Sequence, residues 1–251
     1  MGLSIFHVQD QDAVSEKRSS LWIFLALLLA IALRAALVVA GVVPFNSDEA
    51  VVALMARHIT QGARPIFFYG QAYMGSLDAF LVAAGFRLFG EHVWVVRAVQ
   101  IALACVLVWT GAQLAEQVFR SRRVGLLAAF LLALPAVNLV LYTTVSLGGY
   151  GEALVLGNLM LLASLQAGKS GRGQAGRWLR WRAVCVGFLA GLGAWAFGLS
   201  LAYALPAAVA VLTADDGQRT TDDGRRTTGL RSIVHRLRGT VGGLLFGGLA
   251  G

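Results

Sequence analysis

Two adjacent carboxylates, Asp48 and Glu49, directly follow a long apolar run at residues 21–43. About 20 apolar residues suffice to cross a bilayer as a helix, so the acids are expected at the membrane surface where the chain emerges. A carboxylate placed there can take a proton from a hydroxyl group that attacks a lipid-borne donor. Acids in a first helical turn also offset the helix macrodipole by about 0.3–1 kcal/mol, and spacing alone does not separate the two roles.

The composition indicates that transmembrane helices position these acids. The chain has 251 residues, of which 57% are hydrophobic and 14% charged, with a mean hydropathy of +0.70. Soluble domains carry about 25% charged residues, so the sequence predicts a polytopic membrane protein with an all-α transmembrane helix bundle. The net charge of +8 lies in basic clusters between apolar runs, which is the positive-inside pattern and argues against nucleic-acid binding.

The apolar runs predict the order of the spans. Residues 1–20 are expected to be a cytoplasmic tail, followed by a transmembrane domain over residues 21–251 that includes a cytoplasmic loop at 213–239. A last apolar run at 240–251 stops abruptly, which indicates a domain truncated at its C-terminus. Pro135 is expected to kink the third span. The expected spans cover residues 21–43, 94–115, 124–142, 150–166 and 183–212, the last as two short helices broken around 197–200 or as one tilted span.

Residues 44–92 form an external segment that is too long for a simple connector. One helix is expected to start after Ser47 as its N-cap, and a second is expected from Ser76 to Gly90. Both are expected to lie at the membrane interface. An aromatic, glycine-punctuated loop at 65–75 connects them, and its composition suits the headgroup level.

Several short elements of this segment occur in a recognisable order. They are Asn46-Ser-Asp48-Glu49-Ala, Ala56-Arg57, Gly62, Phe68-Tyr-Gly-Gln-Ala-Tyr73, Leu88-Phe-Gly90 and Arg97. This order resembles the first external loop of GT-C-type membrane glycosyltransferases, the protein O-mannosyltransferase and aminoarabinose transferase superfamily. The similarity covers about residues 20–210 and is most specific at 46–97. It implies transfer of a sugar from a polyprenyl-phosphate donor to an acceptor on the external face.

The resemblance also implies site residues. Asp48 matches the family's catalytic acid and is expected to be the general base, with Glu49 as the acid beside it. Many relatives carry Lys-Pro or Pro-Pro where this chain has Met74-Gly75-Ser76, so a lysine that contacts donor phosphate in some members is absent. The residues expected to bind substrate are Arg57, Tyr69, Gln71, Tyr73, Arg97, Tyr150 and Glu152.

Two other functions remain open from the sequence. A transporter or flippase would use Arg34, Glu152 and the helix break near 197–200 as a polar pathway, and a non-catalytic scaffold is the third alternative. Arg34 is expected to pair with Glu116, Glu152 or a later span.

For the enzyme, the expected partners are the polyprenyl-phosphate sugar, a lipid, glycan or protein acceptor, and the membrane. No cofactor or metal site is predicted, although a divalent ion would suit the Asp48 and Glu49 carboxylates. The expected location is the bacterial inner membrane, within the cell envelope, with the N-terminus in the cytoplasm.

Overall fold

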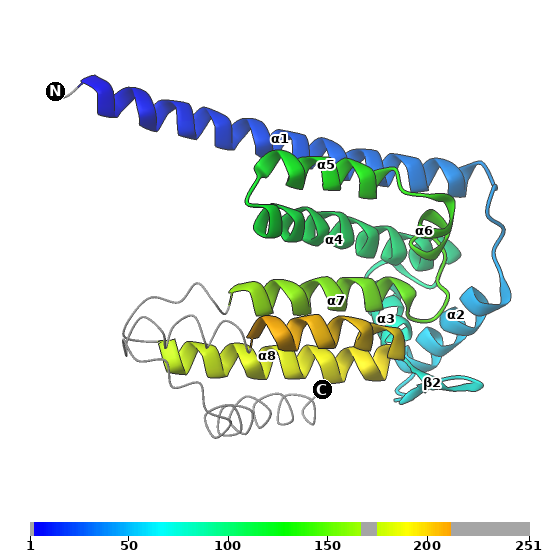
Figure 1. The fold of residues 1–251 in the computed structure, drawn as a ribbon. Coiled ribbons are helices and arrows are strands. Elements are labelled where there is room, and N and C mark those ends of the chain that lie inside the picture. Colours follow the sequence, from blue (N-terminus) through cyan, green and yellow to red (C-terminus); the bar gives the residue numbers. More distant parts are fainter. Residues whose placement is uncertain (1–2, 167–174, 212–251) are drawn as a thin grey trace.

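The fold is an all-α bundle with a small layer of helices and a hairpin at one end (Figure 1). The computed structural model describes residues 3–166 and 175–211. The predicted loop at 213–239 and the apolar run at 240–251 lie outside the described residues.

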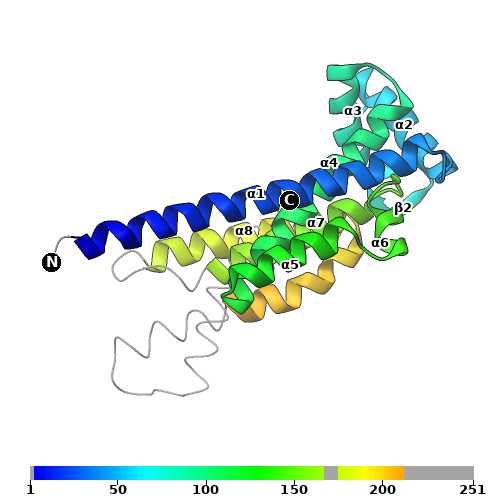
Figure 2. The ribbon, with the colours of Figure 1, turned by 90° about the horizontal axis from the view of Figure 1, so that it is seen from above.

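The bundle helices run alongside one another over most of their length (Figures 1 and 2). Two of its segments, Ser20–Val39 and Val93–Phe119, are long and apolar enough to cross a membrane. Small side chains of α1, α4 and α5, such as Ala26, Ala112 and Ala129, are fully or almost fully buried where these helices meet. The bundle helices are α1 (Leu3–Val39), α4 (Val93–Phe119), α5 (Arg122–Ala133), α7 (Tyr150–Leu165) and α8 (Ala175–Ala196).

The predicted third span is interrupted where Pro135 was expected to kink it. Helix α5 ends at Ala133, and the short helix α6 (Val137–Tyr142) starts after the break. Proline cannot donate a backbone hydrogen bond and disfavours a helical conformation at the residue before it. The break directs the chain toward the end of the bundle where the external segment lies (Figure 1).

Residues 175–211 form two helices, which is the first of the two alternatives expected from the sequence for residues 183–212. Helix α8 ends at Ala196, Phe197 is extended, and a second helical segment runs over Gly198–Val211, beginning with the 3-10 turn η2 (Gly198–Tyr203). Val211, at the end of the second segment, shares a buried cluster with Ala183 and Val186 in the middle of α8, so the second segment folds back along α8. Phe197, where the chain reverses, lies at the same end of the bundle as α6, because its ring contacts Tyr150, which stacks on Tyr142.

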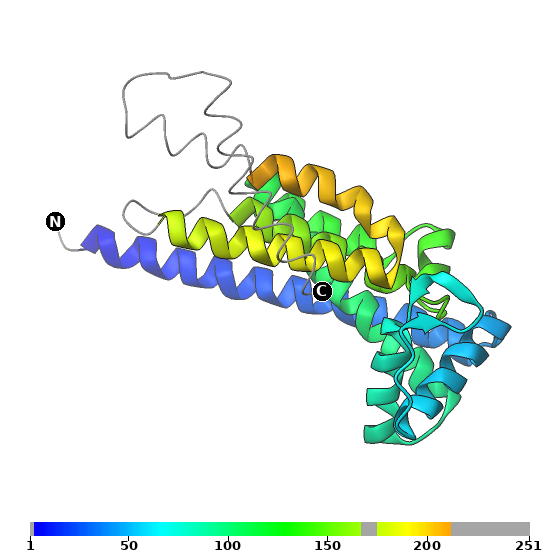
Figure 3. The same ribbon diagram turned by 90° about the horizontal axis from the view of Figure 1, so that it is seen from below.

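The external segment forms the layer at this end (Figure 3). It consists of α2 (Ser47–Thr60), the antiparallel strands β1 (Phe67–Phe68) and β2 (Gln71–Gly75), and α3 (Leu77–Phe89). Buried side chains such as Val52, Met55 and Val82 pack it against the start of α4. The prediction that Ser47 caps α2 is wrong: the N-cap is Asn46, because its side chain accepts from the Glu49 N–H and its own N–H meets the Glu49 carboxylate.

Arg34, deep in α1, is almost fully buried. The prediction that it pairs with Glu116 or Glu152 is wrong in the described part of the chain. Its guanidinium donates to the Thr143 hydroxyl at 2.8 Å and to the Ala30 carbonyl at 3.2 Å. These oxygens satisfy the buried donors locally, which ties α1 to the segment after α6.

Candidate active site

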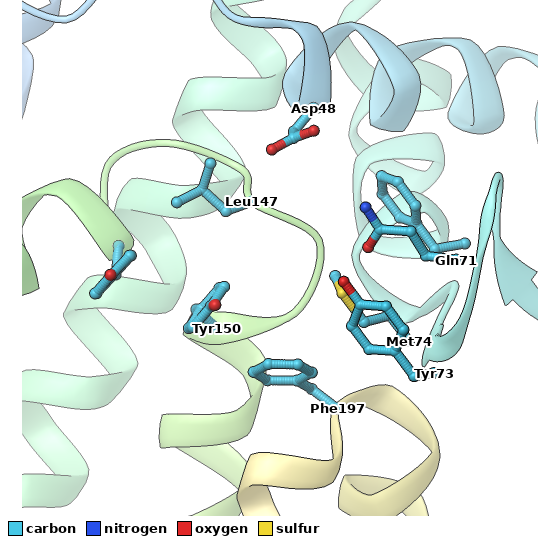
Figure 4. Close-up of a pocket in the computed structure, with 9 residues that line it drawn as sticks. Asp48, Gln71, Tyr73, Met74, Leu147, Tyr150 and Phe197 are labelled. Carbon is cyan, nitrogen blue, oxygen red and sulfur yellow. The ribbon is translucent and has the colours of Figure 1, made fainter.

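A pocket of about 200 Å³ lies between the external layer and the end of the bundle (Figure 4). This volume is below the roughly 300–1,000 Å³ of pockets for drug-sized ligands, so it suits a single ring such as one sugar residue. Four segments that are distant in sequence supply its walls. The lining residues are Asp48, Phe68, Gln71, Tyr73, Met74, Tyr142, Leu147, Tyr150 and Phe197.

Asp48 is the only acid among the described residues that line the pocket. It lies in the first turn of α2, and Figure 4 shows its carboxylate directed into the space between Leu147 and Gln71. The Asn46 capping box fixes the start of this helix: the Asn46 side chain accepts from the Glu49 N–H at 3.0 Å. The orientation of Asp48 therefore rests on backbone hydrogen bonds at the helix start.

Glu49, the next residue, is directed into the protein interior. It is fully buried, and Arg97 of α4 binds both carboxylate oxygens, through Nε at 2.5 Å and through Nη2 at 2.6 Å. Arg97 Nη2 also donates to the Pro44 carbonyl at 3.2 Å. Burial raises the pKa of the Glu49 carboxyl, while the nearby Arg97 charge and the Asn46 N–H oppose this change. The pair thus holds the start of α2 against α4.

Aromatic side chains form the wall opposite the external layer. Tyr142 and Tyr150 stack with their ring centroids 4.7 Å apart and their planes at 9°. Phe197, at the end of α8, approaches Tyr150 at 4.8 Å with a tilt of 57°. Met74 of β2 also forms an isolated bridge with Phe197, so the hairpin contacts this wall directly. A sugar ring entering the pocket would meet aromatic faces on this side and Asp48 on the other.

A second buried network lies at the junction of the layer and the bundle. The Asp78 carboxylate of α3 accepts hydrogen bonds from Gln100 Nε2 at 2.8 Å and from the Ser146 hydroxyl. The Glu152 carboxyl of α7 lies beside Asp78, and neither of its oxygens has a hydrogen-bond partner among the described residues. Burial raises the pKa of Asp78, and the hydrogen bonds from its partners oppose the shift. Asp78 lies in the first turn of α3 and is only 3% exposed.

The structure brings some of the predicted site residues together and separates others. Gln71, Tyr73 and Tyr150 line the pocket with Asp48, and Glu49, Arg97 and Glu152 are buried beside it.

Arg57 and Tyr69 lie outside the pocket lining. Arg57 forms an exposed ion pair with Glu91 at 3.1 Å, and the Tyr69 hydroxyl lies 3.1 Å from His58 Nδ1.

The sequence analysis missed five lining residues, which are Phe68, Met74, Tyr142, Leu147 and Phe197. Phe68 lies in the resembling motif, and Tyr142 and Phe197 mark helix ends, so these positions carried a local signal. Met74 directly follows that motif, whereas Leu147 carried no such signal. Within the described ranges, 3–166 and 175–211, three or more His, Cys, Asp or Glu side chains nowhere converge as a metal site would require.

Comparison with known families decides between the functions left open by the sequence. The model of the dolichyl-phosphate-mannose-protein mannosyltransferase family matches residues 76–225, which is more than half of the chain. The chain belongs to this family. The matched stretch includes Tyr142, Leu147, Tyr150 and Phe197 of the pocket, whereas Asp48 lies before it. The search of curated proteins finds no match, and the search of solved structures finds none.

Membership of the mannosyltransferase family makes this chain an integral membrane glycosyltransferase that uses a polyprenyl-phosphate sugar donor. The charges that favoured a transporter have other partners, since Arg34 binds Thr143 and the Glu152 carboxyl lies beside Asp78. The pocket is consequently the candidate site of sugar transfer.

Proposed function

We propose that this chain transfers a sugar from a polyprenyl-phosphate donor to a hydroxyl acceptor at the external membrane face, with Asp48 as the general base. The observation that supports it most is the position of Asp48 in the pocket, opposite the Tyr142 and Tyr150 stack. In the proposed reaction the acceptor oxygen bonds to the anomeric carbon while the bond from that carbon to the phosphate oxygen breaks. The hydroxyl proton goes to Asp48, and the bonding electrons leave with the phosphate.

The other polar groups of the pocket suit donor binding. Gln71, Tyr73 and Tyr150 line it and carry amide or hydroxyl donors that can meet the sugar hydroxyls or the phosphate. Arg97 is committed to Glu49, so we assign that pair to holding Asp48 in place. Arg57 stays a predicted phosphate ligand that would have to exchange its exposed pairing with Glu91.

The arrangement of charge along α4 supports the external location. The pocket layer lies at the start of this helix, and Arg120, Arg122 and Arg123 lie at its other end. Twenty-seven helical residues span about 40 Å, which exceeds the roughly 30 Å hydrocarbon core. Basic turns favour the cytoplasmic side, so the pocket is assigned to the opposite side, with the N-terminus in the cytoplasm. A bacterial inner membrane remains our prediction.

The test is a transfer assay in membranes with radiolabelled polyprenyl-phosphate mannose. Asp48→Asn removes the base but keeps the shape of the side chain. We expect transfer to fall by about 10²–10⁴-fold, the usual contribution of a general base.

Glu91→Gln is the matched control for this assay. It neutralises an exposed acid of the same external segment that lies outside the pocket, and we expect it to retain activity. Equal transfer by wild type and Asp48→Asn, at equal expression, would remove Asp48 from the chemistry.

A further inference from the structure

The network beneath the pocket contains two buried acids that form no ion pair with a cation of the described residues, 3–166 and 175–211. We call Asp78, Gln100, Ser146 and Glu152 the acid cluster. Asp78 and Glu152 are 3% and 2% exposed, and their carboxyl groups lie next to each other. Of the two buried arginines in the described chain, Arg97 binds Glu49 through Nε and Nη2, and Arg34 donates to Thr143 and Ala30.

Two carboxyl groups in contact away from water cannot both be ionised, because the repulsion and the loss of hydration both oppose it. A single proton between them removes the repulsion and supplies the hydrogen bond. The partners indicate which acid carries it. Asp78 accepts from the Gln100 amide and the Ser146 hydroxyl, as a carboxylate does. Neither Glu152 oxygen receives a donor from the described residues, so the Glu152 carboxyl is the natural donor to Asp78.

The acid cluster is connected to both sides of the pocket. Ser146 donates its hydroxyl to Asp78, and its backbone N–H lies near the Glu49 carboxylate, which places α3 beside the helix that carries Asp48. Ser146 directly precedes Leu147, and Glu152 follows Tyr150 by two residues. Leu147 and Tyr150 are pocket-lining residues. The hydrogen bonds of the cluster therefore position one wall of the pocket relative to Asp48.

We propose that Glu152 is a positioning residue that carries a proton at neutral pH, and that its hydrogen bond to Asp78 holds Leu147 and Tyr150 opposite Asp48. The consequence for sugar transfer rests on the proposed function, whereas the protonated pair itself does not. The proposal replaces the expectation that Glu152 contacts substrate: its carboxyl faces Asp78 and lies outside the pocket lining.

The surrounding charges define what else could titrate with the pair. Among the described residues, α2 contributes Glu49 and α4 contributes Arg97, which neutralise each other. On the pocket side are Asp48, Tyr142, Tyr150 and Tyr73. The other charged or titratable side chains described on packed elements are Arg57 and His58 on α2, Arg87 on α3, Cys105 and Glu116 on α4, Arg182 and Cys185 on α8, and Tyr203 on η2.

The first test measures thermal unfolding of the full chain in detergent against pH, for wild type, Glu152→Gln and Asp78→Asn. In Glu152→Gln the side-chain amide can still donate a hydrogen bond to Asp78, but it has no titratable proton. In Asp78→Asn an amide NH₂ group replaces one of the two carboxylate oxygens that accept from Gln100 and Ser146. We expect Glu152→Gln to unfold near the wild-type temperature at neutral pH and Asp78→Asn to unfold roughly 4–8 °C lower.

The pH dependence identifies the proton. The folded pair holds a proton that the unfolded acids release above about pH 4–5, so wild-type stability falls as pH rises beyond that range. Glu152→Gln lacks this proton and is expected to lose less stability on the alkaline side. Parallel curves for the two proteins, or equal damage from the two substitutions, would overturn the proposal. Stabilisation of wild type by Mg²⁺ that Glu152→Gln abolishes would also overturn it, because the pair would then hold a cation.

The transfer assay tests the positioning role. Glu152→Ala is expected to lower sugar transfer about tenfold or more. Glu152→Gln is expected to keep transfer near the wild-type rate. It should also lose less activity than wild type when the pH is raised, because its amide has no proton to release. Loss of transfer in both variants alike would contradict positioning through a hydrogen bond. If wild type itself fails to transfer the sugar, the proposed function fails, while the unfolding curves still decide whether the pair shares a proton.

Discussion

At the scale of residues, the neighbours Asp48 and Glu49 have opposite environments. Consecutive residues of a helix point about 100° apart, so a helix lying over the end of the bundle can direct one acid into the pocket and the next into the interior. Asp48 lines the pocket, and Glu49 binds Arg97. The acid pair noticed in the sequence thus combines a candidate base with the ion pair that fixes its helix.

This division predicts a strong effect of breaking the buried pair. Arg97→Met leaves the Glu49 charge buried and unpaired, which typically costs about 3–5 kcal/mol of unfolding free energy. Adding Glu49→Leu removes that charge, so the double variant should be more stable than Arg97→Met alone. Unfolding experiments in detergent measure the free energy of unfolding of Arg97→Met and of the double variant.

Arg57→Met, which breaks the exposed pair with Glu91, is the matched control and should cost no more than about 1 kcal/mol. A double variant that is less stable than Arg97→Met would show that Glu49 contributes chiefly through its other contacts, with Asn46 and Ser146.

The sequence could indicate some of these residues and not others. Gln71 and Tyr73 were found because they belong to an ordered motif within one loop. The acid cluster joins α3, α4, the loop after α6 and α7, and no spacing along the chain relates Asp78 to Ser146 or Glu152. Such contacts depend on how helices pack, which a single sequence does not specify.

At the scale of elements, the loop between α6 and α7 shapes the pocket. Gly148 and Gly149 have φ angles of +77° and +139°, a region that side chains rarely adopt. A Cβ at Gly148 would lie 2.5 Å from Met74 Cε and 3.0 Å from Phe68 Cε2. The loop therefore approaches the β1–β2 hairpin closely only because this residue is glycine.

Gly148→Ala should consequently destabilise the protein and also lower sugar transfer. The backbone strain costs about 1–2 kcal/mol, and displacement of Met74 and Phe68 would reshape the pocket wall. Gly41→Ala is a matched control, because Gly41 has a φ of +64° but nothing within 4 Å of its Cβ position. The control should lose stability through strain alone and keep its apparent affinity for the donor. An equal loss of transfer in both variants would argue against a role of this contact.

The boundaries of the elements were largely predictable, since they depend on local chemistry. The helix from Ser76 to Gly90 and the break at Pro135 follow from residues that start or stop helices. The cap of α2 was assigned one residue too late, because Asn46 and Ser47 both favour that position and the hydrogen bond to the Glu49 N–H decides between them. How the layer of α2 and α3 packs on the bundle could not be predicted, because that packing joins residues distant in sequence.

At the scale of the whole molecule, the arrangement separates the pocket from the basic turns. The external layer gathers at one end of the bundle (Figures 1 and 3), and the α4–α5 turn lies at the other end, beside the middle of α1 (Figure 1). A donor held by its lipid chain would reach the pocket at the membrane surface, where its phosphate stays hydrated. The proposed reaction therefore requires that the two ends face opposite sides of the membrane.

Cysteine labelling tests this requirement. With Cys105 and Cys185 replaced by alanine, Ala63→Cys places a thiol in the exposed loop after α2, and Ser121→Cys places one in the α4–α5 turn. A membrane-impermeant maleimide should label residue 63 on intact cells and residue 121 only after permeabilisation, because basic turns stay in the cytoplasm. Labelling of both residues from the same side would contradict the bundle as a membrane-crossing unit. The reversed pattern would move the pocket to the cytoplasmic face, and the acceptor would then have to be sought there.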